Sequence, residues 1–176
     1  MSSGRRRSGV VALVGDSGTG KTTLAERLIP ALAARGLAVG TVKHASHGFE
    51  ADRPGKDSQR HYASGAQAVA LACDGQLASF VRRDAAGPVR LAEALALLPD
   101  GLDLVLVEGF SWEPIPRVVI VREGRAPRAE HLRSGPVLRT VRVAEHAPGT
   151  KPAFSDDLVE ALAGEIVECF AMEEAG

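Results

Sequence analysis

The sequence predicts a three-layer α/β fold built around a mainly parallel, mixed central sheet. Two runs dominated by apolar residues, at positions 10–14 and 102–107, lack the polar alternation of a strand with one exposed face. We therefore expect both to be strands that are buried on two sides. Strand-like and helix-like segments alternate along the chain, which is the order typical of parallel α/β proteins.

The first three expected elements form a strand–helix–strand unit. After the strand at residues 10–14, a helix is expected over residues 22–35, with Gly36 as its stop, and a second strand over residues 37–42. The apolar residues of the helix recur at the spacing of one helical face: Leu24, Leu28, Ala31 and Leu32. A crossover of this length is what two parallel strands require.

The later elements are shorter, and we expect them all in one domain over residues 10–176, after a disordered basic tail at residues 1–9. Residues 44–55 are expected to form a polar loop, and residues 124–135, rich in Arg, Pro and Gly, the most mobile loop. The other expected elements are a helix at 56–64, strands at 66–72 and 76–81, a helix at 88–98, strands at 102–107, 117–121 and 137–143, and a helix at about 156–170 with Ser155 as its N-cap.

The composition is that of an ordinary globular protein. Hydrophobic residues make up 45% of the 176 positions and charged residues 24%, and the formal net charge is -1. This charge balance does not favour nucleic acid or a membrane surface as a partner. No apolar run approaches the ~18 residues that cross a bilayer, and Cys73 and Cys169 lack any metal-binding or redox spacing. We expect a soluble, cytoplasmic protein with free thiols.

Residues 15–22 match the phosphate-loop pattern G-x-x-x-x-G-K-[ST] at every defined position. Glycines allow the backbone to turn its N–H groups toward phosphate oxygens, Lys21 brings a cation to the β- and γ-phosphates, and Thr22 offers a hydroxyl to Mg²⁺. The helix that follows directs its positive dipole end at the anion. The residues expected to contact a nucleoside triphosphate are Gly15, Asp16, Ser17, Gly18, Thr19, Gly20, Lys21, Thr22 and Thr23.

Phosphate-loop proteins also carry an acid at the end of another apolar strand, where it orients Mg²⁺ or its waters. Asp103 and Glu108 stand at the two ends of one expected strand. Parallel α/β proteins bind ligands at the carboxyl ends of their strands, where the phosphate loop also lies. Glu108 is therefore predicted to be a metal ligand and, with Lys21, a catalytic residue. Asp103 is predicted to be a strand-start or turn residue.

The polar loop after the second strand is predicted to form another wall of this site. Asp52 can join the Mg²⁺ shell through a water molecule and act as a third catalytic residue. The residues expected to contact anions or position water are Lys43, His44, Arg53 and Lys56. The alternative is a solvated polar loop. A zinc site is disfavoured because no third histidine or cysteine lies near the first two histidines of the loop.

Three motifs, in this order, resemble the molybdopterin-guanine dinucleotide biosynthesis protein B family, MobB. They are the phosphate loop GDSGTGKTTL (15–24), the segment VKHASHGFEADRPGKDSQRHYASGA (42–66) and the strand DLVLVEGF (103–110). The resemblance covers residues 10–121, roughly two thirds of the chain. It departs from the family pattern at Ala45 and Gly48, where a threonine and an acid are expected.

The resemblance implies a P-loop NTPase fold and a protein that binds GTP with Mg²⁺ and hydrolyses it weakly. It also implies a homodimer that associates with protein A, the nucleotidyltransferase that joins GMP to molybdopterin, with molybdopterin itself as a further candidate partner. Residues 15–22 match the family's phosphate loop, and Glu108 matches its strand-end acid. The residues within its second motif are Lys43, His44, Asp52 and Lys56.

Two alternatives stay open. A small-molecule kinase would use the same phosphate loop and close an arginine-rich lid, residues 122–133, over the phosphates. A nucleotide-gated adaptor would hold protein A or the pterin without needing hydrolysis. The preference for GTP rests on the resemblance alone, because the sequence has no N-K-x-D motif for guanine. Trp112 can either stack on a ligand or pack at the rim of the site.

Overall fold

The computed structural model describes residues 9–50, 52–84, 87–146 and 150–173. It divides into two compact units: the sheet unit, described over residues 9–44, 90–146 and 150–173, and the hairpin unit, described over residues 45–50, 52–84 and 87–89. The predicted tail lies outside the described residues except for Gly9, which begins the first strand. The assignment of residues 10–176 to one domain stays a prediction.

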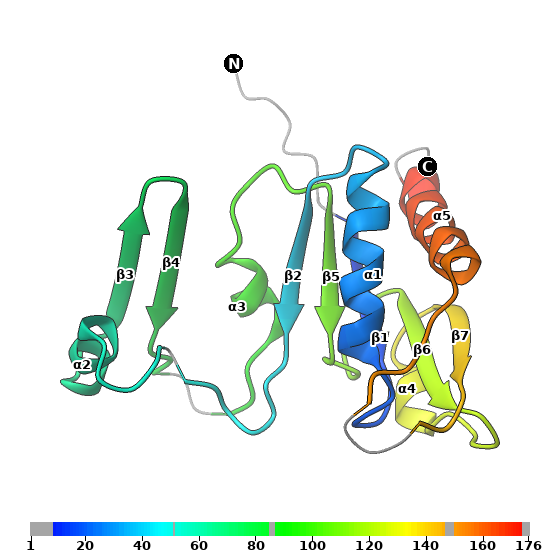
Figure 1. Cartoon of the computed structure of the whole chain (residues 1–176), viewed down its shortest axis with the longest axis horizontal. Coiled ribbons are helices and arrows are strands. Elements are labelled where there is room, and N and C mark those ends of the chain that lie inside the picture. Colours follow the sequence, from blue (N-terminus) through cyan, green and yellow to red (C-terminus); the bar gives the residue numbers. More distant parts are fainter. Residues whose placement is uncertain (1–8, 51, 85–86, 147–149, 174–176) are drawn as a thin grey trace. The chain divides into compact units, whose positions relative to one another are not determined.

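The sheet unit is built on five parallel strands in the order β2-β5-β1-β6-β7 (Figure 1). The strands are β1 (Gly9–Val14), β2 (Val39–Lys43), β5 (Leu104–Glu108), β6 (Arg117–Arg122) and β7 (Val137–Val143). The central strand β1 therefore has β5 and β6 as its neighbours. This order confirms the predicted α/β fold with a mainly parallel sheet. The antiparallel strand pair forms a separate sheet in the hairpin unit.

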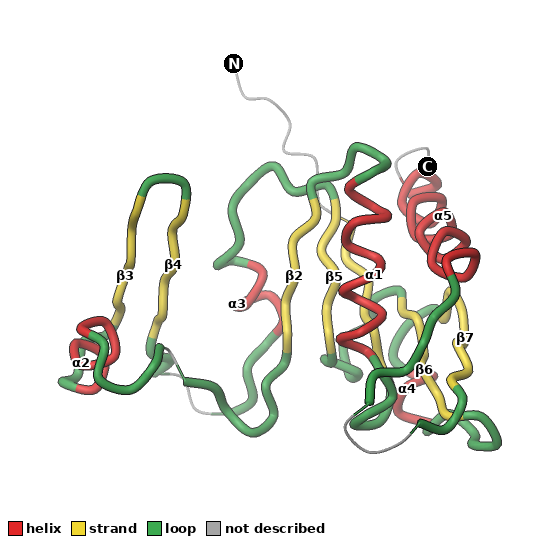
Figure 2. The backbone as a smooth tube through the Cα atoms, viewed as in Figure 1, coloured by secondary structure: helices red, strands yellow, loops and turns green. Residues whose placement is uncertain are grey.

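Both faces of β1 are buried, as its apolar run predicted: the residues from Val11 to Val14 are at most 1% exposed. One face packs on helices α1 (Lys21–Ala33) and α5 (Asp156–Glu173), which lie side by side (Figure 2). The apolar positions predicted for α1 are all buried in this core: Leu24, Leu28, Ala31 and Leu32. Across the described residues, no helix has the length and apolar character needed to cross a membrane.

Two structural roles assigned from the sequence are confirmed. Asp103, just before β5, accepts a hydrogen bond from the Ala38 N–H at 2.8 Å, so it is a strand-start residue. The Ser155 hydroxyl accepts a hydrogen bond from the Leu158 N–H at 3.3 Å, as an N-cap residue does. These bonds fix where β5 and α5 begin.

Two segments differ from the expectation. Helix α3 (Leu91–Leu95) is shorter than the helix predicted over residues 88–98, because the N–H groups of Leu97 and Leu98 donate to carbonyls three residues back rather than four, which tightens and ends the helix. Within the predicted loop at 124–135, the chain forms the short helix α4 (Ala129–Arg133). Five residues are too few for an apolar period to reveal a helix.

The hairpin unit contains helix α2 (Asp57–Ala63) and a two-stranded antiparallel sheet of β3 (Ala68–Cys73) and β4 (Gln76–Val81). The strands are joined by the predicted turn, in which Gly75 has a φ of 87°. Val69 is the one buried strand residue of this described hairpin. The hairpin therefore has no buried face comparable to those of β1.

Candidate functional site

The loop between β1 and α1 has the backbone shape that its glycines predicted. Gly15, Gly18 and Gly20 have φ angles of 152°, 71° and 92°, which residues with a side chain rarely adopt. A Cβ on Gly15 would stand 2.3 Å from the carbonyl oxygen of Ile120 in β6. A Cβ on Gly20 would stand 2.2 Å from Cγ of Pro152. Only glycine fits at these two positions, so the loop is held closely by its surroundings.

Lys21 begins α1, and its side chain turns back over the loop. Its Nζ donates hydrogen bonds to the carbonyl oxygens of Gly15 and Asp16, both at 2.8 Å. Burial lowers the pKa of this ammonium, while the carboxylates of Glu108 and Asp16 act in the opposite direction. An ammonium beside the N-terminus of a helix favours a bound anion.

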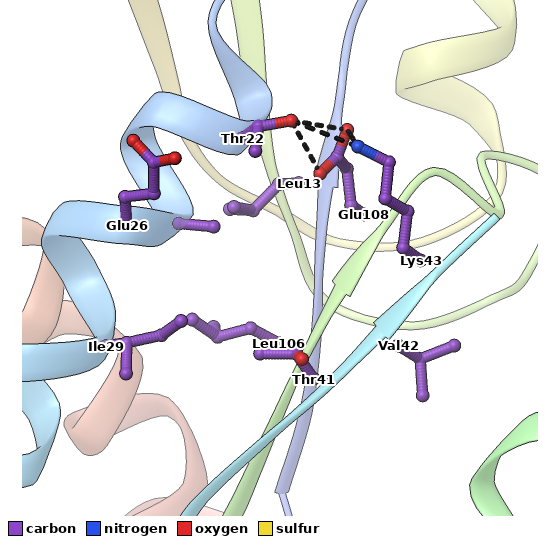
Figure 3. Close-up of a pocket in the computed structure, with 10 residues that line it drawn as sticks. Leu13, Thr22, Glu26, Ile29, Thr41, Val42, Lys43, Leu106 and Glu108 are labelled. Carbon is purple, nitrogen blue, oxygen red and sulfur yellow. Dashed lines mark hydrogen bonds and ion pairs between the residues drawn. The ribbon is translucent and has the colours of Figure 1, made fainter. Parts of the chain in front are cut away.

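The predicted metal ligands Thr22 and Glu108 are in contact (Figure 3). The Thr22 hydroxyl donates to the two carboxylate oxygens of Glu108, at 2.9 and 2.8 Å, and Lys43 Nζ lies 3.1 Å from Glu108 Oε1. Glu108 stands opposite Lys43 in the register of β5 with β2, and opposite Leu13 in that of β5 with β1. Parallel pairing therefore brings these charged groups to the sheet edge where the phosphate loop begins.

The oxygens of Thr22 and Glu108 fit a Mg²⁺ ion. Mg²⁺ is commonly bound through one or two protein oxygens, with waters and substrate phosphates in its remaining positions. Among the described residues, no group of three or more His, Cys, Asp and Glu side chains is arranged to hold a metal ion. Glu108 would then be the charged protein ligand. The Lys43 ammonium would be repelled by the metal ion and attracted by phosphates.

A groove of about 200 Å³ extends from this cluster between α1 and the strands β2 and β5. Its apolar lining includes Ala25, Ile29 and Leu106, and its polar end is formed by the same Thr22 and Glu108 (Figure 3). The groove is also lined by Glu26 and Thr41, and it adjoins the predicted metal ligands.

His44, Phe110 and Trp112 pack together after the ends of β2 and β5. The His44 ring lies edge-on to Phe110 at 5.1 Å and to Trp112 at 5.0 Å between ring centres. Phe110 is buried and has a φ of 51°, which is costly for a residue other than glycine. His44 is thus held in an aromatic cluster, and its predicted anion contact stays a prediction. Trp112 packs on this cluster and remains half exposed.

Asp52, Arg53 and Lys56 belong to the hairpin unit and are described within it. The Asp52 carboxylate accepts hydrogen bonds from the Ser58 hydroxyl and, at 2.6 Å, from the Arg53 N–H. These bonds, that of Ser58 first, lower the pKa of Asp52. Lys56 is the N-cap residue of α2. Local structure thus accounts for Asp52, and the contacts predicted for these three residues with phosphate or Mg²⁺ stay predictions.

Arg117, the first residue of β6, is fully buried, and the sequence predicted only a strand start there. Its guanidinium donates hydrogen bonds to four carbonyl oxygens: those of Ser111 at 2.8 Å, Ile115 at 3.3 Å, His131 at 3.5 Å, and Glu113. Burial lowers the pKa of Arg117. The bonds connect the loop after β5, which follows Glu108, to helix α4.

Sequence reasoning missed two arginines beside the phosphate loop. Arg128 Nε lies 2.7 Å from Asp16 Oδ1, and a Cβ on Gly18 would lie 3.3 Å from Arg122 Nη2. The sequence offered both only as part of a kinase lid, because nothing in it shows that β6 is a neighbour of β1. The one available signal was the position of Arg122 at the end of an apolar strand, which is also the signal that identified Glu108.

Comparisons with known sequences find close relatives of this chain. The family model of molybdopterin guanine dinucleotide synthesis protein B, MobB, matches residues 10–143. The molybdopterin-guanine dinucleotide biosynthesis adapter protein of Escherichia coli K12 is 39% identical over 124 residues, which are 70% of this chain and 71% of that protein. The protein of the same name from Haemophilus influenzae is 42% identical over 115 residues, 65% of this chain and 64% of that protein.

A solved structure extends the match to most of the fold. The crystal structure of a MobB homolog from Bacillus stearothermophilus has a TM-score of 0.64 and 33% sequence identity to this chain, over 90% of this chain and 98% of that one. The residues matched by the family model include the phosphate loop, Glu108 and both arginines beside the loop. The chain therefore belongs to the MobB family.

Proposed function

We propose that this protein binds GTP with Mg²⁺ at residues 15–22 and hydrolyses it slowly, as an accessory in molybdopterin guanine dinucleotide biosynthesis. The observation that carries the proposal is the contact of Thr22 with Glu108 at the mouth of the phosphate loop. It joins a hydroxyl at the start of α1 to a carboxylate at the end of β5, as a site for a Mg²⁺–nucleotide complex requires. The pathway is supported by the family and by the names of the relatives. The choice of GTP rests on the resemblance to the family.

Each side chain of the site has a role in this proposal. Lys21 and the N–H groups of the loop would bind the phosphates, and Thr22 and Glu108 would hold the metal ion, which would supply positive charge to the phosphates. Lys43 Nζ lies 3.3 Å from Thr22 Oγ1, close enough to reach the same phosphates. Phosphoryl transfer to water depends mostly on positioning and charge stabilisation, so this arrangement supports slow hydrolysis without a dedicated base.

Nucleotide binding is tested by calorimetry with GTP and ATP in the presence of Mg²⁺. We expect tighter binding of GTP than of ATP, and a loss of at least about tenfold in GTP affinity for Lys21→Ala, which removes a charged phosphate contact. Lys151→Ala is the control, because this exposed lysine pairs with Glu26. Equal binding of ATP would contradict the guanine preference. Absence of binding by the unaltered protein would contradict the whole proposal.

The relatives are named adapter proteins, which favours a second candidate, an adaptor that works through partners. For this candidate, hydrolysis would be dispensable. In either case we propose that the protein associates with protein A, the nucleotidyltransferase of the pathway, and with molybdopterin. Lys21→Ala separates the two functions. If the variant has lost nucleotide binding and still binds protein A and supports cofactor formation, the adaptor is correct; if cofactor formation falls with nucleotide binding, the GTP-dependent accessory is correct.

We also propose a homodimer, which the hairpin unit supports. A two-stranded hairpin is marginally stable by itself in water, and this one leaves Leu71, Leu77 and Val81 exposed. Pairing with the hairpin of a second copy would bury these side chains and cover a sheet edge. Light scattering on the eluting protein should give the mass of a dimer, and Leu77→Lys should give that of a monomer. A monomer in both cases would contradict this assembly.

A further inference from the structure

The strands on either side of the phosphate loop end in opposite charges. The loop follows β1, which lies between β5 and β6. Glu108 ends β5 and contacts Thr22, whereas Arg122 ends β6. Because all three strands are parallel, both charged residues lie at the edge where the loop begins. We call the Glu108 side the acid side and the Arg122 side the basic side.

On the basic side, the Arg122 guanidinium lies beside Gly18 of the loop. Its Nη2 is 3.3 Å from the point that a Cβ on Gly18 would occupy. Among the described residues, no carboxylate forms an ion pair with Arg122. A guanidinium in this position, with its donors not taken by an acid, is suited to donate hydrogen bonds to phosphate oxygens.

Asp16 adds a negative charge to a loop that is otherwise suited to anions. Its carboxylate pairs with Arg128, 2.7 Å from Nε to Oδ1, while its backbone carbonyl accepts a hydrogen bond from Lys21. An unpaired carboxylate at this position would repel a polyphosphate. Arg128 therefore offsets a charge that the loop itself carries.

The segment that presents both arginines is held to the sheet. The Glu123 N–H donates to the Val143 carbonyl at 2.8 Å, and Arg142 Nη1 donates to the Arg125 carbonyl at 3.2 Å. Helix α4, which follows Arg128, is anchored by buried His131, whose carbonyl accepts from Arg117. The guanidinium groups therefore extend from a fixed backbone and need no lid movement to reach the loop.

We propose that Arg122 binds the terminal phosphate of a nucleoside triphosphate and so makes the site prefer triphosphate over diphosphate, while Arg128 neutralises Asp16. The proposal rests on the proposed function, since it needs a nucleotide in the loop. It assigns a specificity-determining residue to the basic side. Charge is then supplied to the terminal phosphate within the same chain, as in enzymes that carry their own arginine for phosphoryl groups.

The test compares the affinities for a non-hydrolysable GTP analogue and for GDP, both with Mg²⁺. For Arg122→Ala, we expect the triphosphate affinity to fall by at least about tenfold, which corresponds to the loss of one charged hydrogen bond. The affinity for GDP should change by less than about threefold. Arg122→Lys should recover part of the loss, because an ammonium keeps the charge without the planar donor set. Arg90→Ala is the matched control, because this exposed arginine pairs with Glu93.

The outcomes separate this proposal from the proposed function. Equal losses for the two nucleotides, or no loss for either, would overturn the role of Arg122 while leaving nucleotide binding in place. Failure of the unaltered protein to bind any nucleotide would overturn the proposed function itself. Thermal melting of each variant confirms that it is folded.

Arg128 is tested by a double-mutant cycle with Asp16. Arg128→Ala should weaken binding of both nucleotides, because it leaves the Asp16 carboxylate unpaired beside the phosphates. Adding Asp16→Asn should restore most of the affinity, since the repulsive charge is then gone. A variant Arg128→Ala that binds normally, or one that Asp16→Asn fails to restore, would overturn the neutralising role.

Discussion

The sheet unit and the hairpin unit use similar apolar residues with opposite results. Leu28 of α1 is completely buried in the sheet unit, whereas Leu77 of β4 is 85% exposed in the hairpin unit. Five strands flanked by helices bury both faces of the central strand, but two strands alone cannot bury either of theirs. Apolar residues in a strand therefore identify the strand without showing what it packs on. The phosphate loop belongs to the sheet unit, whose strands pack on helices of the same unit.

The largest expected effect comes from truncating a leucine in each unit, in protein dilute enough to be monomeric. Leu28→Ala should lower the free energy of unfolding by about 2–5 kcal/mol, the cost of a buried leucine and its cavity. Leu77→Ala should change it by less than about 0.5 kcal/mol, as at other exposed positions. Urea unfolding followed by circular dichroism measures both. Similar losses would show that Leu77 packs within its own chain and would remove the contrast.

A smaller effect is expected from pH in the sheet unit, through His131 of α4. Burial lowers the pKa of His131 below its usual 6.5, so the unfolded chain takes up the proton more readily than the folded protein does. The contribution of His131 to stability is therefore complete above pH 6.5 and falls as the pH drops below it. Unfolding measured from pH 7.5 to 5 should show this fall, and His131→Gln should reduce it. His61→Gln, in the hairpin unit, should leave it unchanged.

The smallest effect is expected in the hairpin unit, in a different pH range. The Ser58 hydroxyl and the Arg53 N–H lower the pKa of Asp52 below its usual 3.8. The stabilisation they give is present above pH 3.8 and is lost as the pH falls through the lowered value. Titration of the Asp52 carboxyl by NMR should show an upward shift of its pKa in Ser58→Ala. An unchanged pKa would mean that this hydrogen bond does not hold the loop before α2.

The parts of the molecule that the sequence predicted well are those determined by local patterns. The eight residues of the phosphate loop carry their own geometry, because Gly15 and Gly20 are needed for backbone shape and close contact. Glu108 was found from a general rule about the carboxyl ends of parallel strands, and its contact with Thr22 agrees with that rule. Burial of β1 on both faces followed from an uninterrupted apolar run.

The rest depends on which strands become neighbours, and no local pattern contains that information. Arg122 and Arg128 reach the loop only because β6 pairs with β1, an order that is fixed by packing of the whole sheet. The same reason applies to β3 and β4, which were predicted as strands but not as a sheet of their own. Helix α4 escaped prediction because the interactions that hold it, including the hydrogen bond from Arg117 to His131, come from distant residues.

Because of buried Arg117, the segments on the two sides of the phosphate loop are expected to unfold together. Its guanidinium donates hydrogen bonds to the carbonyls of Ser111 and Glu113, which follow β5 on the acid side. It also donates to that of His131 in α4, which follows Arg128 on the basic side. If either segment left its place, buried charged donors would lose their acceptors, at a cost larger than that of one surface contact. Amide hydrogens of both segments are therefore expected to exchange with solvent at similar rates, as one cooperative unit.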